Sequence, residues 1–413
     1  MSDLNDKSEK ENKIEPRLLK GFRDFGPAEQ LARQQMFSSI QSVFERFGFL
    51  PLSTPVLEYK EILMGKYGED EKLVYSFKDK GDRDVAMRYD LTVPLARYVA
   101  QNQGQLTFPF KRYQIAPVWR ADNPQKGRLR EFYQCDVDAV GTDSLVADSE
   151  VIACLCKALE AVGVTNYRVR LNDREILKDF SVAAIRAIDK IDKIGVDGIV
   201  AEMEAQGVPE EEIVRAKSLA DPKFITAPES TVKIMKMIEA YGLKGDVEFD
   251  PTIARGLDYY TGTVFEIYLK DKPEFGSICS GGRYDGLVDQ FSSQSLPAVG
   301  GSIGVDRLID ALKDMGEMNF AQPIRALILN QNESLMENYL KLATDLRAQG
   351  INVELYYSAA KLDKQFKYAE SRSIPYAIIM GETEVKAETV QLKDLAKREQ
   401  ETIFTAELAE KLK

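Results

Sequence analysis

Residues 113–141 read YQIAPVWRADNPQKGRLREFYQCDVDAVG. The first part, up to Trp119, has the aromatic and apolar content of a β-strand, and residues 131–140 alternate polar with apolar side chains. Between them, a polar segment with Asn123, Pro124 and Gly127 is typical of a loop. The stretch therefore predicts a strand, a hairpin loop and a second strand.

The loop of this hairpin is basic although the whole chain is acidic. Residues 111–130 contain one acid, Asp122, and six basic residues, whereas the formal net charge of the chain is −11. The basic residues are Lys111, Arg112, Arg120, Lys126, Arg128 and Arg130. Such a loop suits a polyphosphate or an RNA end, and the alternative is a solvated charged turn. We favour the interpretation that the loop binds an anion, because Arg120 is next to Trp119, where a bulky cation needs a partner.

The segments around the hairpin predict a larger, mostly antiparallel sheet with helices. Strand-like segments lie at residues 73–79, 84–90, 247–269, 277–287 and 298–304, and helical segments at 27–47, 91–102 and 144–162. Residues 173–240 are rich in Ala, Lys, Glu and Ile at helical spacing, which indicates a helical insertion. We therefore expect an α+β domain over residues 17–320, interrupted once.

A second pattern begins at Pro323. Short apolar strands alternate with helices, and this order is typical of a parallel α/β domain. The strands are expected at 324–329, 351–357 and 375–380, the helices at 334–350 and 361–373, and two further strands at 389–395 and 399–404. Residues 323–413 are therefore predicted to form a separate α/β domain.

The chain of 413 residues contains no histidine, and this limits its chemistry. A Ser-His-Asp triad, a Cys-His dyad and a histidine metal site are all excluded. Acid–base work would fall to carboxylate, tyrosine, lysine or the substrate, unless the reaction needs mainly positioning and charge stabilisation. The four cysteines form no Cys-x-x-Cys pair, so no metal site is expected.

The composition favours a cytoplasmic protein with reduced, buried thiols. No apolar run approaches the ~20 residues that span a bilayer, so no membrane partner is expected. The N-terminal segment is polar, has mixed charge and lacks the apolar core of a signal peptide. Residues 1–16 are predicted to be a disordered tail.

Two glycine-rich stretches are candidates for anion binding or tight turns. AVGGSIGVDRL, residues 298–308, places glycines before a helix that starts near Gly304 and puts Arg307 in its first turn. A cation there opposes the helix dipole, which favours an external anion. CSGGRYDGL, residues 279–287, reads as a glycine turn with Arg283, Tyr284 and Asp285, and by itself favours a structural role.

Three further stretches carry polar side chains in strand-like patterns. MRYDLTVPLARY spaces Asp90 and Thr92 by two residues, so both are expected on one face. QCDVDAVG likewise places Gln134, Asp136 and Asp138 on one face, although a solvent-facing side is a substantial alternative for Asp136. ARGLDYYTGTVFE, residues 254–266, brings an arginine, an acid and two tyrosines to the start of a strand.

Together these stretches resemble the histidyl-tRNA synthetase family of class II aminoacyl-tRNA synthetases. RGLDYYTGTVFE and SGGRYDGL resemble its two histidine-specific signatures, WRADNPQKGRLREFYQCD its motif 2, and GGSIGVDRL its motif 3. The helix and prolines at 27–55 resemble motif 1, and the segment from KLDKQFKYAESRSIPYAIIMGE to LKDLAKREQ resembles the anticodon-binding domain. The likeness covers residues 18–413. It implies a class II catalytic core followed by an anticodon-binding α/β domain.

The resemblance also implies residue roles. Arg120, Arg128 and Arg307 would hold ATP, and Arg255 would act as a fixed cation in place of a metal. Asp90 and Thr92 would hold the substrate amino group, and Gln134 would contact the substrate near its carboxylate. Asp138, Tyr260 and Tyr284 would form the imidazole pocket. The residues implied to bind histidine are Asp90, Thr92, Arg120, Gln134, Asp138, Arg255, Leu257, Tyr259, Tyr260 and Tyr284, and those implied to be catalytic are Arg255, Arg120 and Gln134.

The implied reaction is ATP-dependent attachment of histidine to tRNA(His) through a histidyl-adenylate. Mg²⁺ would enter with ATP, and the chain would form a homodimer through its motif 1 helix. Lys126, Lys364 and Lys367 are expected to contact tRNA, the last two with Lys361 on one C-terminal helix. Two alternatives remain open: a catalytically inactive regulatory subunit of histidine biosynthesis, and an RNA-binding module that lacks catalysis.

Overall fold

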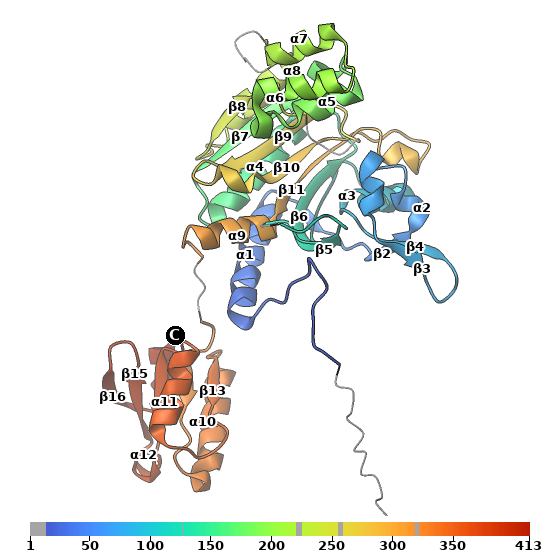
Figure 1. Cartoon of the computed structure of the whole chain (residues 1–413). Coiled ribbons are helices and arrows are strands. Elements are labelled where there is room, and N and C mark those ends of the chain that lie inside the picture. The colour runs from blue at the N-terminus through green and yellow to red at the C-terminus, as the bar shows by residue number, and fades with distance from the viewer. Residues whose placement is uncertain (1–13, 126, 220–224, 255–258, 319–321) are drawn as a thin grey trace, which may run out of the picture. The chain divides into compact units, whose positions relative to one another are not determined.

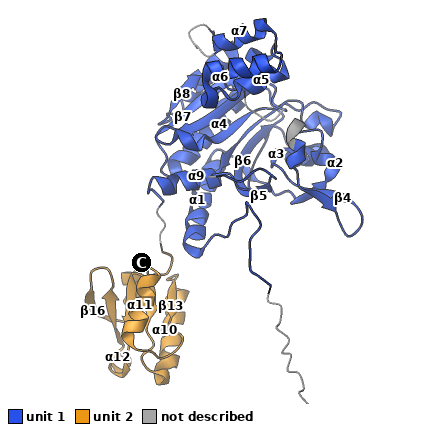
Figure 2. Ribbon diagram, in the orientation of Figure 1, with its two compact units in different colours: residues 1–318 blue, residues 319–413 orange. Residues whose placement is uncertain are grey.

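The computed structural model describes residues 14–125, 127–219, 225–254, 259–318 and 322–413 (Figure 1). Most of the predicted tail, residues 1–13, lies outside the described part. The chain divides into two compact units, residues 1–318 and 319–413 (Figure 2). The boundary expected from the sequence, at 320–323, falls beside this division.

An eight-stranded sheet organises the first unit, with strand order β1-β5-β6-β11-β10-β9-β7-β8. Its strands are β1 (Leu50–Pro51), β5 (Phe110–Trp119), β6 (Glu131–Val140), β7 (Tyr167–Asp173), β8 (Asp246–Phe249), β9 (Thr263–Leu269), β10 (Ser277–Arg283) and β11 (Ala298–Gly304). The strands from β5 to β7 pair antiparallel, and the two outermost pairs are parallel. The predicted mostly antiparallel sheet is confirmed, and the quoted hairpin is β5–β6.

A smaller sheet accounts for the early strand-like segments. Its strands are β2 (Leu57–Tyr59), β3 (Ser76–Lys78) and β4 (Asp84–Met87), in the order β2-β4-β3. Because β4 ends at Met87, Asp90 and Thr92 do not lie on a strand. Thr92 instead begins helix α3 (Thr92–Asn102), so the expectation that strand alternation places both residues on one face is wrong.

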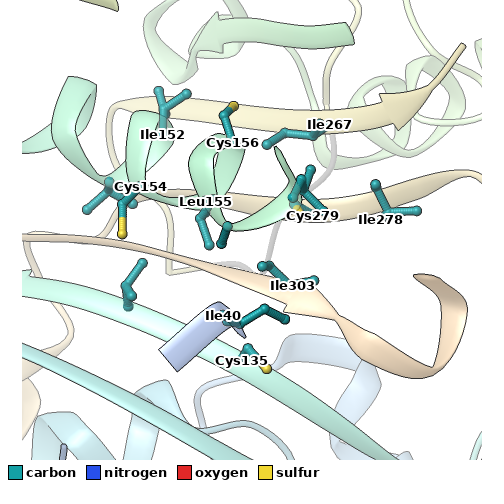
Figure 3. Packing of buried hydrophobic residues seen from close by; sticks show 14 of the residues in the cluster. Ile40, Cys135, Ile152, Cys154, Leu155, Cys156, Ile267, Ile278, Cys279 and Ile303 are labelled. Carbon is teal, nitrogen blue, oxygen red and sulfur yellow. The ribbon is translucent and has the colours of Figure 1, made fainter. Parts of the chain in front are cut away.

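Helices α1 (Pro27–Arg46), α4 (Leu145–Ala161) and α9 (Val305–Asp314) cover one face of the large sheet (Figure 1). Figure 3 shows Ile40 of α1, Leu155 of α4 and the strand residues Cys135 and Ile303 in this core. All four cysteines are buried and free. Because side chains alternate along β6, its odd-numbered residues enter the core and its even-numbered residues face the other way.

The predicted insertion is helical in its described part. It contains α5 (Val182–Ile188), α6 (Ile191–Ala205), α7 (Glu210–Leu219) and α8 (Glu229–Glu239). Helices α5, α6 and α7 share a hydrophobic core that includes Ile188, Ile199 and Ile213, whereas Ile234 and Ile238 of α8 belong to the core of the large sheet. The short helix α2 (Lys60–Leu63) completes the first unit; its single turn is too short to give a periodic signal.

The second unit is a five-stranded sheet in the order β13-β12-β14-β15-β16. Its elements are β12 (Ala326–Ile328), α10 (Met336–Ala348), β13 (Val353–Leu355), α11 (Leu362–Ser371), β14 (Tyr376–Ile379), α12 (Glu382–Ala387), β15 (Thr389–Asp394), β16 (Glu399–Phe404) and α13 (Leu408–Leu412). The β12 pairs are parallel, as predicted, and β14–β15–β16 are antiparallel. The sequence did not predict α12 or α13, since each spans under two turns. No described helix in either unit is long and apolar enough to cross a membrane.

Candidate functional site

The face of the large sheet opposite α1 and α4 borders a cavity of about 610 Å³. A smaller cavity of about 190 Å³ adjoins it, since Arg120, Gln134, Ser302 and Arg307 line both. Half of the lining residues come from β6, β9, β10 and β11 and from the residues just before β9. The combined space therefore lies over the centre of the sheet.

The floor of the cavity is formed by alternate side chains of β6 and by glycines of the neighbouring strands. Gln134, Asp136 and Asp138 all line it, as their spacing along β6 predicts. Gly300, on the neighbouring strand β11, is opposite Asp138, and an added Cβ there would overlap the Asp138 carboxylate. An added Cβ on Gly281 would overlap the backbone of β11. The glycines therefore let the strands and the carboxylate approach closely.

Asp138 is buried, with a hydrogen-bond donor at one oxygen and a cation beside the other. The Tyr284 hydroxyl donates to Oδ1, and Arg112 Nη2 lies 2.8 Å from Oδ2. Burial raises the pKa of Asp138, while Arg112 and the Tyr284 hydrogen bond oppose that rise. Arg112 is itself fully buried and also donates to the Leu91 carbonyl at 2.9 Å. Asp138 is therefore held in place by the protein.

Asp136 Oδ1 and Asp138 Oδ2 are both buried without a hydrogen-bond partner among the described residues, but Asp138 Oδ2 lies in the ion pair with Arg112. Burial, with smaller contributions from Asp138 and Asp90, raises the pKa of Asp136 to about 7, although Arg112 and Ser302 lower it. The side chain is only 3% exposed. The solvent-facing interpretation of Asp136 is therefore wrong.

Asp90 lies before the first turn of α3 and accepts hydrogen bonds from four groups. Oδ1 accepts from Tyr67 Oη at 3.2 Å and from the backbone N–H groups of Thr92 (3.2 Å) and Val93 (3.0 Å). Oδ2 accepts from Tyr259 Oη at 3.3 Å. Asp90 and Thr92 thus both line the cavity, but a helix start brings them together. Burial raises the pKa of Asp90.

Tyrosine rings form the wall beside these carboxylates. The rings of Tyr259 and Tyr260 meet edge to face with centroids 5.1 Å apart, and those of Tyr259 and Tyr284 with centroids 5.8 Å apart. All three rings line the cavity. This end of the cavity therefore combines three buried acids with hydroxyl donors and apolar ring faces.

Arginines line the other end. Arg120 Nε donates to the Tyr89 carbonyl at 3.1 Å, and its guanidinium lies 4.3 Å from the Tyr89 ring centroid. Arg307, in the first turn of α9, donates to the Ser277 carbonyl. Arg128 Nε lies 3.4 Å from Asp122 Oδ2. Backbone carbonyls and one acid orient these cations beside the cavity, an arrangement suited to an anion.

Two of the six basic residues counted with the hairpin loop do not belong to it. Arg112 is buried beneath the acid end, and Lys111 pairs with Glu150 at 2.8 Å and donates to the Phe47 carbonyl at 2.6 Å. Both residues lie within β5, where neighbouring elements supply their partners. The loop is therefore less basic than the count indicated.

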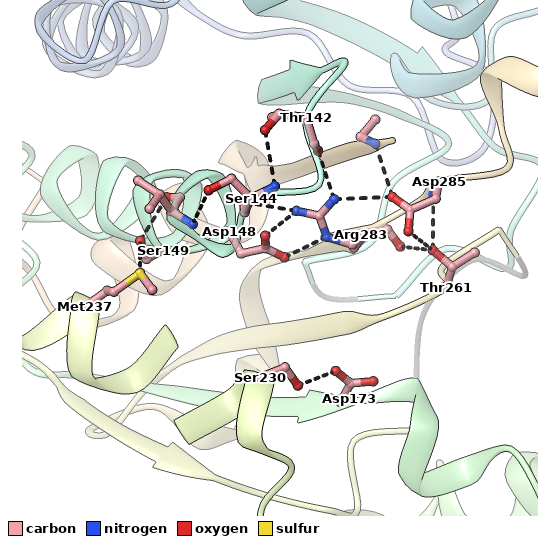
Figure 4. A network of polar contacts seen from close by, with 12 residues as sticks. Thr142, Ser144, Asp148, Ser149, Asp173, Ser230, Met237, Thr261, Arg283 and Asp285 are labelled. Carbon is pink, nitrogen blue, oxygen red and sulfur yellow. Dashed lines mark hydrogen bonds and ion pairs between the residues drawn. The ribbon is translucent and has the colours of Figure 1, made fainter. Parts of the chain in front are cut away.

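Arg283 has a structural role. Its guanidinium pairs with Asp148 of α4 and donates to the Thr142 carbonyl at 3.0 Å, and Asp285 Oδ1 lies 3.3 Å away (Figure 4). The predicted glycine turn is wrong, because Gly281 and Gly282 lie within β10, packed closely against neighbouring strands. Tyr284, the next residue, lines the cavity, as Ser280 and Gly281 of the same stretch do.

Several predicted site residues cannot be placed in the cavity. Arg255, Leu257 and Lys126 lie outside the described residues. Lys364 and Lys367 are exposed on α11 of the second unit, and Lys361 is the residue that precedes this helix.

The sequence also missed lining residues. Ser302 follows the glycines of motif 3, and Glu266 lies on β9; both line both cavities. Ser302 accepts a hydrogen bond from Gln134 Nε2 at 3.0 Å. The alternation along β9 and β11 was visible in the sequence, and only the pairing of these strands with β10 and β6 shows that they share one floor.

Comparisons with known proteins agree over almost the whole chain. Residues 21–308 match the family model for histidyl-tRNA synthetase, and residues 325–413 match the model for an anticodon binding domain. A histidine–tRNA ligase of Rhodopirellula baltica is 43% identical over 94% of this chain and 96% of its own length. One of Cytophaga hutchinsonii is 39% identical over 96% of this chain and 99% of its own.

A comparison with solved structures also finds a histidyl-tRNA synthetase. The crystal structure of histidyl-tRNA synthetase from Nostoc sp. PCC 7120 has a TM-score of 0.84 and 32% identity. The match covers 97% of this chain and 99% of that chain. The chain described here therefore belongs to the histidyl-tRNA synthetase family.

Proposed function

We propose that this chain is an aminoacyl-tRNA synthetase that activates histidine with ATP and transfers it to tRNA(His). The observation that carries the proposal is the continuity of the two cavities, which joins an acid-and-tyrosine end to an arginine end. An amino acid with a polar aromatic side chain fits the first end. A nucleotide polyphosphate fits the second.

At the acid end, the groups present suit the parts of histidine that carry donors. Gln134 Oε1 is buried and has no hydrogen-bond partner among the described residues. It lies between the two ends, where it would accept from the substrate ammonium together with Asp90 and Thr92. Carboxylate and phenol groups would contact the imidazole. Substrates without these donors would leave buried polar groups unpaired, which discriminates by about 10⁴ or more.

At the arginine end, the reaction would be attack of the histidine carboxylate on the α-phosphorus of ATP. The P–O bond to diphosphate breaks as the new P–O bond forms, giving histidyl-adenylate and diphosphate. Both reactants are anions, so Arg120, Arg128 and Arg307 would offset their repulsion and the charge that develops. No general base is needed because the nucleophile is already ionised. Arg255 is proposed, from the family resemblance, to contact the α-phosphate and the histidine carboxylate.

Magnesium is proposed to accompany ATP, which offers it phosphate oxygens. Within the described part of the chain, no group of three or more Cys, Asp or Glu side chains is placed to hold a metal. The described residues are proposed to act on the phosphates through guanidinium groups.

The match of residues 325–413 to an anticodon binding domain supports the synthetase over the regulatory alternative. A subunit that only senses histidine needs neither this domain nor three arginines beside an amino acid pocket. Lys126, Lys364 and Lys367 are proposed to contact the tRNA.

A homodimer in the cytoplasm completes the proposal. Apolar side chains on and beside the short strands β1 to β3 are solvent-exposed in the single chain: Leu50, Val56, Leu57, Tyr59 and Phe77. β2 and β3 are the edges of the small sheet. Exposed apolar residues beside unpaired edge strands support burial against a second copy.

The direct test is histidine-dependent exchange of diphosphate into ATP by the purified protein, followed by charging of tRNA(His). The proposal predicts exchange only with histidine and charging only of tRNA(His). Diphosphate exchange without tRNA charging would support the proposed activation of histidine and contradict its proposed transfer to tRNA. Loss of both, in protein that still binds histidine, would favour the regulatory alternative.

A further inference from the structure

Residues 20–25, with the sequence KGFRDF, form a segment before α1 that contacts both elements carrying the cavity arginines. One element is the loop between β5 and β6, which contains Arg120 and Arg128. The other is α9, whose first turn contains Arg307. The segment is far from both elements in the sequence, so these contacts are made only in the folded chain.

Arg130 joins segment 20–25 to the loop. Its backbone N–H donates to the Gly21 carbonyl at 2.8 Å, and its Nη1 donates to the Lys20 carbonyl at 3.3 Å. Through Nε the same side chain donates to the Asp122 carbonyl at 2.9 Å. The Arg130 carbonyl accepts from the Arg120 N–H, also at 2.9 Å. Arg130 therefore ties the segment to both ends of the loop.

Gly21 allows the segment to lie directly against the loop. Its φ is +87°, in the left-handed region that favours glycine. An added Cβ would lie 2.8 Å from Cγ of Arg130 and 2.8 Å from Cγ of Pro124. A larger residue at this position would therefore push the segment and the loop apart.

Arg23 joins the same segment to α9. Its Nη1 donates to Asp310 Oδ1 at 3.3 Å, and its Nη2 lies 3.8 Å from Asp306 Oδ1. Asp306 is buried, lines the smaller cavity and immediately precedes Arg307. The Arg23 guanidinium also lies 4.7 Å from the ring centroid of Phe25. The segment therefore reaches the helix start at the residue beside a cavity arginine.

Asp306 has further partners that do not depend on Arg23. The buried Arg33 of α1 donates to Oδ1, and the backbone N–H of Tyr133 donates to Oδ2 at 2.7 Å. Removal of Arg23 therefore does not leave a buried carboxylate without a cation, and the protein should still fold.

We propose that segment 20–25 holds the β5–β6 loop and the start of α9 in the relative positions that ATP needs, with Gly21, Arg23 and Arg130 as positioning residues. This inference rests on the proposed function, which assigns the cavity arginines to ATP. The three residues line neither cavity and would act only through those arginines. A displacement of about 1 Å by a change outside the reacting groups can cost about 10²-fold in rate.

The first test compares Gly21→Ala with Gly163→Ala in the full-length protein. Gly163 has a φ of +94° and no atom within 4 Å of an added Cβ, so its substitution gives similar backbone strain without a clash. In ATP–diphosphate exchange, Gly21→Ala should raise KM for ATP about 10-fold. KM for histidine should stay within about twofold, and Gly163→Ala should change neither KM. A loss of folded protein alone would lower the rate and leave both KM values unchanged.

Arg23→Ala and Arg130→Ala test the two contacts of the segment separately. Each should raise KM for ATP about 3–10-fold. In the double variant the two effects should combine to less than their product, because release at either contact frees the same segment. These variants also keep the inference testable if Gly21→Ala does not accumulate.

The outcomes separate this inference from the proposed function. A wild type without histidine-dependent exchange would overturn the proposed function and the inference together. With an active wild type, a KM for ATP within about twofold of the wild-type value in Arg23→Ala and Arg130→Ala would overturn the inference alone. Equal increases in KM for ATP and histidine, or effects that multiply fully in the double variant, would overturn it as well.

Discussion

The acid end and the arginine end of the cavity hold their charges in opposite ways. At the acid end, Asp90 and Asp138 receive donors from elements far apart in sequence, including Tyr259, Tyr284 and Arg112. At the arginine end, Arg120 donates to the Tyr89 carbonyl and Arg307 donates to the Ser277 carbonyl, and these bonds orient both side chains. We propose that the first end selects the substrate by shape and hydrogen bonding and that the second end stabilises charge.

The largest expected effect is on the stability of the acid end. Arg112→Met should lower the free energy of unfolding by about 3–5 kcal/mol, because Asp138 would keep its burial and lose its cation. Urea denaturation measures the change. The double variant Arg112→Met with Asp138→Asn should recover part of the loss, since neither charge is then left alone. A loss under about 1 kcal/mol in the single variant would show that this ion pair does not hold the acid end together.

Substitution of an arginine at the arginine end should reduce catalysis rather than stability. Arg120→Ala should lower the rate of ATP–diphosphate exchange by about 10²–10³-fold, of order 3–4 kcal/mol, because a fixed cation beside the phosphates is lost. Arg168→Ala is the matched control: Arg168 pairs with Glu248 at 3.5 Å across β7–β8 and is absent from the cavity lining. Similar exchange rates in both variants would remove Arg120 from the mechanism.

The Asp136 carboxyl makes the stability of the folded protein depend on pH. Its pKa is about 7 in the folded protein and about 3.9 in an unfolded chain, so between these values only the folded state keeps the proton. Its contribution to stability therefore falls as pH rises through this window. Asp136→Asn should be more stable than the wild type by about 1–3 kcal/mol at pH 8, and nearly equal to it near pH 4. Thermal melts across this range test the sign, and an advantage that grows toward low pH contradicts the prediction.

The smallest expected effect comes from substitutions in the second unit, outside the cavity. They test whether histidine activation in the first unit depends on the second unit. Reversing two exposed charges on α11, with Lys364→Glu and Lys367→Glu together, should raise KM for tRNA about 3–10-fold, as expected for lost phosphate contacts. Diphosphate exchange, which needs no tRNA, should be unchanged. Lys341→Glu with Lys386→Glu, on α10 and α12, is the matched control. Equal effects on exchange and charging would show that the lysines act through folding.

Much of the architecture was predictable because it rests on local periodicity. The hairpin at 113–141, helix α4 and the strand–helix alternation after Pro323 all follow from side-chain spacing and were found where expected. Two errors share one cause: Asp90 and Gly281 were assigned from short polar or glycine patterns that suit more than one element. A helix start explains the first, and close strand packing explains the second.

The sequence by itself determined that Gln134, Asp136 and Asp138 share one face, because side chains alternate along any strand. It could not determine which of the two aspartates is neutralised. That depended on the β5–β6 register, which sets Arg112 opposite Asp138 and leaves Asp136 opposite an uncharged glutamine. Register is fixed by the burial of whole strands in the folded core, so only the tertiary structure decided which carboxylate is paired with Arg112.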